Sequence, residues 1–184
     1  GGYSVTGFGA VITGAEGYRL TPGEKAFFRE VKPFGFILFA RNIDTPDQLR
    51  ALVEEMRAAA GHEALITIDQ EGGRVQRLRA PQWRDWPAPL DQVAQAGAEA
   101  ARAMYLRYRI IAAELHALGL DSNCAPLVDV AGPRTHPFLR NRCYGEDAAR
   151  VGALGRAVAE GLLDGGVLPV VKHIPGHGRA EADS

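Results

Sequence analysis

The residues best suited to chemistry fall in two short motifs of the 184-residue chain, the first of which is Asp69-Gln-Glu-Gly-Gly-Arg-Val-Gln-Arg77. A carboxylate accepts hydrogen bonds and a guanidinium donates a planar fork of them, so Asp69 together with the arginines of the motif, Arg74 and Arg77, could hold the hydroxyls of a sugar. The alternative is a carboxylate that caps a strand within a structural ion pair, and the residues alone favour neither. The Gly-Gly pair lets the backbone turn sharply but matches neither a P-loop nor a dinucleotide fingerprint, so a nucleotide site is weakly indicated.

The second motif is Lys172-His-Ile-Pro-Gly-His-Gly178. Lys172 and His173, adjacent at a buried strand end, would be costly to desolvate unless they bound a ligand or a partner. The structural alternative pairs Lys172 with a carboxylate such as Asp129 and leaves His173 satisfied in the core. His173 and His177 have the spacing of a helical metal site, but the Pro-Gly between them excludes a helix, so no metal is expected.

The elements around these motifs indicate an α/β fold. Thr21-Pro-Gly-Glu24 and Thr45-Pro-Asp-Gln48 carry helix-capping signals. Apolar segments of strand length alternate with amphipathic helices and never with hairpin turns, a pattern typical of a parallel sheet covered on both faces. The predicted strands are 10–13, 35–40, 64–69, 122–130 and 167–172, and helices are also predicted over about 91–118 and 151–162.

Polar residues collect where these predicted strands end. The carboxyl edge of the sheet is the ligand edge in a (β/α) barrel and in an open doubly wound sheet alike. A closed (β/α)8 barrel of the TIM type takes roughly 250 residues, so residues 1–184 are expected to be the N-terminal portion of one such barrel domain, covering about the first five β/α units. The polar residues at the predicted edge are Arg41, Asn42, Asp69–Arg74, Asp129 and Lys172–His177.

Composition excludes several classes of function. Lys and Arg number 21 against 22 Asp and Glu and are scattered, so neither nucleic acid nor an anionic membrane surface is an expected partner. No apolar segment approaches the roughly 18 to 20 residues that span a bilayer, and no export signal is visible, which makes the cytoplasm the default location. Cys124 and Cys143 are too few for a disulfide framework and are expected to be buried thiols.

Taken together, the motifs resemble glycoside hydrolase family 3. The resemblance rests on the two motifs above, on the Ala125-Pro-Leu-Val-Asp-Val130 strand and on the closing Ala182-Asp-Ser184, in order over nearly the whole chain. The short loop between the second motif and Asp-Ser is most similar to the bacterial β-N-acetylhexosaminidases of peptidoglycan recycling. That branch implies a cytoplasmic barrel that releases terminal β-linked N-acetylglucosamine from muropeptides without a metal or organic cofactor. The alternatives are a non-catalytic sugar-binding module and a family 3 β-glucosidase.

The resemblance also implies roles for single residues. Asp183 and Ser184 match the first two positions of the family's Asp-Ser-His triplet, in which the Asp holds an acid/base His. The chain is expected to stop before that His and before the nucleophilic Asp of this retaining reaction, so residues 1–184 alone should be inactive and prone to associate. The sugar-binding residues implied by position are Asp69, Arg77, Arg142, Lys172 and His173.

Overall fold

The computed structural model describes residues 3–4, 11–125, 145 and 147–170. Its strands are β1 (Tyr3–Ser4), β2 (Val11–Thr13), β3 (Gly35–Leu38), β4 (Leu65–Ile68), β5 (Gln70–Gly72), β6 (Val75–Gln76), β7 (Ser122–Asn123) and β8 (Leu168–Pro169). Its helices are α1 (Pro22–Val31), α2 (Pro46–Ala60), α3 (Pro89–Ala96), α4 (Ala100–Ala117) and α6 (Ala148–Asp164), with 3-10 turns η1 (Ala40–Asn42) and η2 (Gly97–Glu99).

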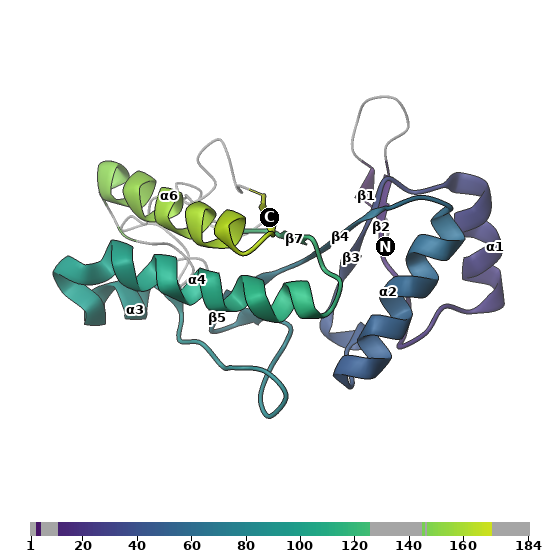
Figure 1. Ribbon diagram of the computed structural model, residues 1–184, viewed down its shortest axis with the longest axis horizontal. Helices are drawn as coiled ribbons and strands as arrows, with labels where there is room; N and C mark the ends of the chain where they lie inside the picture. The colour runs from purple at the N-terminus through teal and green to yellow at the C-terminus, as the bar shows by residue number, and fades with distance from the viewer. Residues whose placement is uncertain (1–2, 5–10, 126–144, 146, 171–184) are drawn as a thin grey trace, which may run out of the picture.

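The strands follow one another in space in the order of the chain, as successive β/α units require. β2, β3 and β4 pair in parallel, and β7 pairs in parallel with β8. The two groups are joined because Asp121 N donates to Ile66 O at 3.3 Å and Cys124 N donates to Ile68 O at 2.9 Å, which places β7 beside β4. Figure 1 shows α1 and α2 beside β2–β4 and, across the molecule, α4 and α6 near β7. The predicted parallel α/β architecture is confirmed.

Both predicted helix caps are present. Thr21 Oγ1 accepts from Glu24 N at 3.1 Å while the Glu24 carboxylate accepts from Thr21 N at 3.0 Å, so the first helix begins with a reciprocal capping box. Thr45 Oγ1 accepts from Gln48 N at 3.1 Å at the start of α2, and Gly61 ends that helix with a φ of 76°. These boundaries are set locally, which is why the sequence predicts them.

Two predictions about the elements are wrong. The helix predicted over about 91–118 is interrupted at Gly97, whose φ of 58° separates α3 from α4 by the turn η2. Antiparallel pairs also occur where none was predicted: β1 pairs with β2, and β5 pairs with β6 in a hairpin. The predicted strands 122–130 and 167–172 lie partly outside the described residues.

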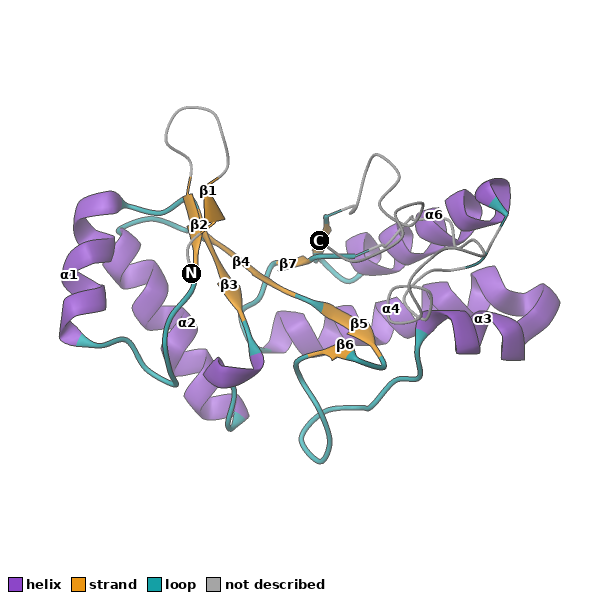
Figure 2. Cartoon of the chain, turned by 180° about the vertical axis from the view of Figure 1, so that it is seen from behind, coloured by secondary structure: helices purple, strands orange, loops and turns teal. Residues whose placement is uncertain are grey.

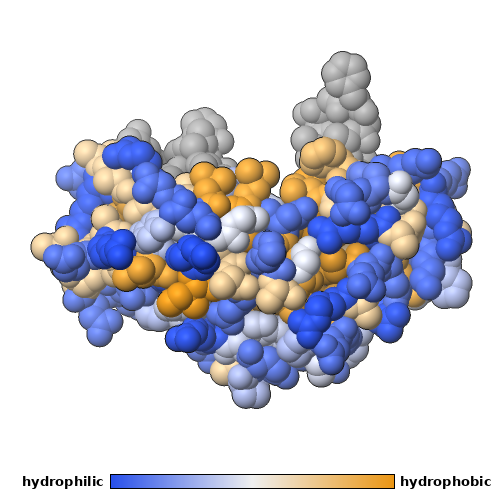
Figure 3. Space-filling model, viewed as in Figure 1, coloured by the Kyte–Doolittle hydropathy of each residue, from blue (hydrophilic) through white to orange (hydrophobic). Residues whose placement is uncertain are grey.

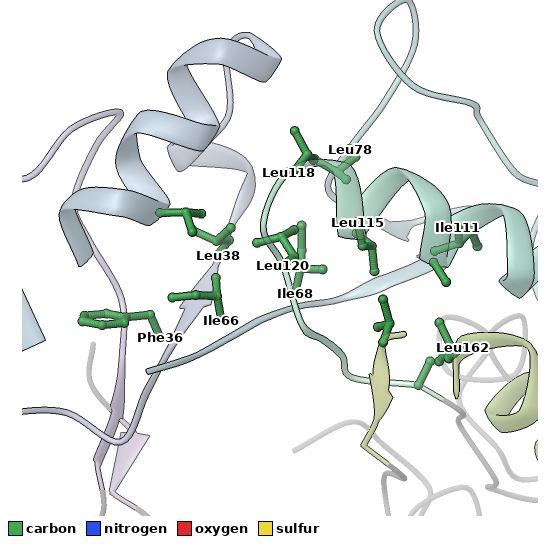
Figure 4. Close-up of a cluster of buried hydrophobic side chains, with 14 of the residues drawn as sticks. Phe36, Leu38, Ile66, Ile68, Leu78, Ile111, Leu115, Leu118, Leu120 and Leu162 are labelled. Atoms are coloured by element: carbon green, nitrogen blue, oxygen red, sulfur yellow. The ribbon is translucent and has the colours of Figure 1, made fainter. Parts of the chain in front are cut away.

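The core joins the sheet to the helices that pack against it. Strand residues such as Phe36, Leu38 and Ile68 are fully buried, as are Leu52 of α2 and Leu115 of α4. Figure 4 shows this cluster running from the strands to the last turns of α4 and to α6. Figure 3 shows mainly hydrophilic residues over the outer sides of α1 and α2, as their amphipathic pattern requires. Within the described ranges, no helix combines the length and apolarity needed to cross a bilayer.

Close contact between α4 and α6 depends on a small residue, which makes a testable prediction about stability. A Cβ on Gly161 would lie 2.5 Å from Tyr105 O, so Gly161→Ala must push the helices apart and should destabilise the protein, by about 1 to 3 kcal/mol. Gly152 of the same helix has only Arg156 Nη1 near its Cβ position, at 3.8 Å. Gly152→Ala should therefore stabilise the protein by about 0.5 to 1 kcal/mol through helix propensity. Urea unfolding of both variants should give shifts of opposite sign, and stabilisation by Gly161→Ala would contradict the close contact.

Candidate functional site

The candidate site lies at the carboxyl end of β4. Asp69 follows that strand directly, and the β5–β6 hairpin then reverses the chain and returns Arg77 to it; Figure 2 shows this hairpin just beyond β4. Arg77 Nη2 contacts Asp69 Oδ2 at 3.5 Å, and the two side chains are 27% and 18% exposed. The structure thus brings together the two residues of the first motif that the sequence selected, and leaves both within reach of a ligand.

A buried amide network fixes the backbone on both sides of this pair. The side-chain oxygen of Gln70 accepts from Arg77 N and from Leu78 N, each at 3.0 Å. The Gln70 backbone in turn exchanges two hydrogen bonds of 3.0 Å with the side-chain amide of Asn123, at the end of β7. Asp69 and Arg77 are therefore held by neighbours whose own positions are fixed.

The loop after the hairpin is tied down in a similar way. Gln76 Nε2 donates to Leu78 O and to Arg84 O, both at 2.7 Å, and Gln76 Oε1 accepts from Trp86 N at 3.1 Å. Further along, Arg84 N donates to the Glu114 carboxylate of α4. Burial raises the pKa of Glu114, and this backbone N–H partly opposes that rise. The loop consequently closes over the base of the hairpin as an ordered segment.

Two residues of α4, Arg107 and Tyr108, hold the hairpin by hydrogen bonds, and neither was selected from the sequence. Arg107 Nη2 and the Tyr108 hydroxyl both donate to the carbonyl of Glu71 in β5, the latter at 3.1 Å. Both side chains are essentially buried. The one signal in the sequence is that Arg107 stands four residues before Ile111, on the apolar stripe of the helix. A cation on such a stripe requires a polar partner in the fold.

The glycine pair of the first motif makes the sharp turn predicted for it. Gly72 has a φ of 118° and Gly73 a φ of 59°, values that favour glycine. A Cβ on Gly72 would lie 2.0 Å from Arg107 Nη2 and 2.7 Å from Pro87 O. The space beside Gly72 is therefore occupied by this chain's own guanidinium and backbone.

Arg41 and Asn42, predicted at the same edge, serve the loop after β2. Asn42 is buried and donates to Ala15 O at 3.0 Å and to Gly17 O at 2.8 Å. Arg41 Nε donates to Ala15 O at 2.9 Å, and its guanidinium lies over the ring of Phe39. The hydrogen bonds of both side chains hold the backbone of this loop, so the structure gives no support to either residue as a ligand-binding group.

The remaining predicted site residues lie outside the described residues: Arg142, Lys172, His173, Asp183 and the alternative partner Asp129. Cys143 lies there as well, while Cys124 is half-buried, not buried as predicted, beside Thr67 Oγ1 at 3.3 Å. Among the described ranges, no group of three or more His, Cys, Asp or Glu gathers as metal ligands would.

The geometry defines a class of protein. A parallel β/α sheet that carries a rigid, partly exposed carboxylate and guanidinium at its carboxyl edge fits a barrel that binds a polyhydroxyl ligand at that edge. The Glycosyl hydrolase family 3 N terminal domain matches residues 24–184. The chain belongs to this family, and the resemblance noted from the sequence is confirmed.

Known relatives agree in sequence and in fold. The Beta-hexosaminidase of Chromobacterium violaceum is 38% identical over an alignment 185 residues long. The alignment covers 96% of this chain and 50% of that protein. Native NagZ from Neisseria gonorrhoeae superposes with a TM-score of 0.86 at 31% identity, covering 94% of this chain and 52% of that one. The same NagZ in complex with N-trifluoroacetyl-D-glucosamine gives a TM-score of 0.85 at 31% identity, with 94% and 52% covered. The TIM-barrel-like fold is thereby confirmed, and the chain spans about half the length of the curated relatives it matches.

Proposed function

We propose that the protein carrying this chain is a retaining β-N-acetylhexosaminidase that releases terminal β-linked N-acetylglucosamine from peptidoglycan fragments in the cytoplasm. The observation that carries the proposal is similarity to Beta-hexosaminidases over 96% of the chain, together with an Asp69–Arg77 pair held rigidly at the ligand edge. The N-acylated glucosamine bound to the gonococcal NagZ supports a sugar of this class as the ligand.

In this proposal, residues 1–184 are the N-terminal portion of a single barrel domain and form most of the sugar-binding side. The Asp69 carboxylate accepts hydrogen bonds from sugar hydroxyls, and Arg77 donates to sugar oxygens while it orients that carboxylate. Arg142, Lys172 and His173 complete the sugar contacts. No organic cofactor or metal takes part.

Asp183 would hold the imidazole of the family's Asp-Ser-His triplet. A carboxylate beside an imidazole stabilises its cationic form, which suits a group that protonates the leaving oxygen and later activates water. The retaining route passes through a covalent glycosyl-enzyme formed on a second carboxylate.

Substrate choice tests the proposal directly. The complete protein should hydrolyse an aryl β-N-acetylglucosaminide and leave the matching aryl β-glucoside nearly untouched, because the glucoside lacks the N-acyl group of the proposed substrate. NMR of the first product should show the β-anomer, as retention requires. Preference for the glucoside would favour a family 3 β-glucosidase, and binding of N-acetylglucosamine without turnover would favour a non-catalytic sugar-binding module.

A further inference from the structure

We propose that Arg107 and Tyr108 of α4 are a positioning pair that sets the geometry of the sugar site through the Glu71 carbonyl. The inference rests on the proposed function, since it takes Asp69 and Arg77 to be the groups that contact sugar. Neither Arg107 nor Tyr108 touches the ligand. They affect binding by fixing the hairpin that Asp69 and Arg77 flank.

Two donors on one buried oxygen make a strong constraint. A carbonyl oxygen has two lone pairs, and Arg107 Nη2 and the Tyr108 hydroxyl both donate to Glu71 O. Arg107 is 1% exposed and Tyr108 is fully buried, so water does not replace either donor. Where the local dielectric constant is low, hydrogen bonds are strengthened and an unsatisfied carbonyl is costly.

Arg107 is itself held in place from other directions. Its Nη1 donates to Gln92 Oε1 of α3 at 2.7 Å. Its guanidinium carbon lies 5.4 Å from the ring centre of Trp86 and 5.6 Å from that of Tyr108. Gly72 leaves room for the guanidinium against the hairpin backbone. Two helices and the loop after the hairpin therefore fix the direction in which Arg107 donates.

The hairpin needs such support because it is short. β5 has three residues and β6 has two, and an isolated hairpin of this size is barely stable in water. Glu71 is in β5 and lies two residues after Asp69, and β6, the strand paired with β5, is followed directly by Arg77. A shift of the Glu71 carbonyl would therefore move the backbone of both Asp69 and Arg77.

Two conservative substitutions in the complete protein test the pair. Tyr108→Phe removes only the hydroxyl and should raise the Ki of N-acetylglucosamine about 3- to 10-fold, the effect of one neutral hydrogen bond. Arg107→Lys keeps the charge but loses the fork and should raise Ki about 10-fold or more. The KM of an aryl β-N-acetylglucosaminide should rise in parallel. Tyr105→Phe is the matched control on the same helix, because the Tyr105 hydroxyl donates to Asp164 of α6, and it should leave Ki and KM unchanged.

A purely structural role would give a different result. Loss of folded protein lowers the apparent kcat but leaves Ki and KM of the remaining enzyme unchanged, and that outcome would overturn the proposal. A double-mutant cycle adds a second check: Tyr108→Phe should raise Ki less in an Asp69→Asn background, because Asp69 is one of the two groups that Tyr108 positions. Additive effects would also overturn the positioning role. A wild-type protein that neither binds N-acetylglucosamine nor hydrolyses its glycoside would instead refute the proposed function, and with it the sugar site that the pair is said to position.

Discussion

Replacing Asp69 by Ala in the complete protein should lower kcat/KM for an aryl β-N-acetylglucosaminide about 10- to 150-fold. The substitution removes a charged acceptor, and hydrogen bonds to charged groups contribute about 1.5 to 3 kcal/mol each. It also leaves Arg77 without the carboxylate that contacts its Nη2 at 3.5 Å. Initial rates at low substrate concentration measure the loss, and circular dichroism confirms that the variant is folded.

Asp85 provides the matched control for this experiment. It stands in the loop after the hairpin and lies 4.0 Å from Arg79 in an exposed ion pair. Asp85→Ala should leave kcat/KM within about twofold of wild type, since exposed pairs contribute little to stability or geometry. If the Asp69→Ala variant folded and kept the wild-type kcat/KM, Asp69 would be a strand-capping residue in a structural ion pair and not a sugar ligand.

Gly72→Ala should be the most damaging single substitution at the site. The new Cβ would meet Arg107 Nη2 and Pro87 O, and the residue would have to keep a φ of 118°. Backbone strain and overpacking each cost of order 1 to 3 kcal/mol, so the variant should lose about 3 to 5 kcal/mol of stability or open the hairpin. Urea unfolding and the Ki of N-acetylglucosamine together detect either outcome.

Two further variants separate the causes of this loss. Gly61, at the end of α2, has a φ of 76° and nothing within 4 Å of its Cβ position, so Gly61→Ala measures left-handed strain alone, about 1 to 2 kcal/mol. Gly72→Ala should cost less stability in an Arg107→Ala background than in the wild type, because the guanidinium is then absent from the collision while Pro87 O and the strain remain. Gly72→Ala that cost no more than Gly61→Ala would show that the hairpin is not packed against α4 in this way.

Features that depend on short-range order can be predicted from the residues alone. The capping residues Thr21 and Thr45 each accept a hydrogen bond from a backbone N–H three residues further along the chain. The starts of α1 and α2 can therefore be predicted from a few adjacent residues. Continuous apolar strands predicted a parallel sheet, and the order of motifs predicted the family that the comparisons confirm. The resemblance also selected Asp69 and Arg77, and their contact at 3.5 Å fits the sharp turn predicted for the two glycines between them.

The way the Asp69–Arg77 pair is held depends on contacts between distant parts of the chain. Asn123 bonds to the Gln70 backbone across 53 residues, and Arg107 reaches the Glu71 carbonyl across 36. In the sequence, the apolar stripe of the helix indicates that Arg107 is buried, which is uncommon for a cation, but it does not identify the partner of Arg107. The role of Arg107 and Tyr108 follows from burial against a particular carbonyl, and which carbonyl an α4 side chain meets depends on how that helix packs beside the sheet. Periodicity predicts the buried face of a helix but not the partner that it meets, because that partner comes from a distant part of the chain.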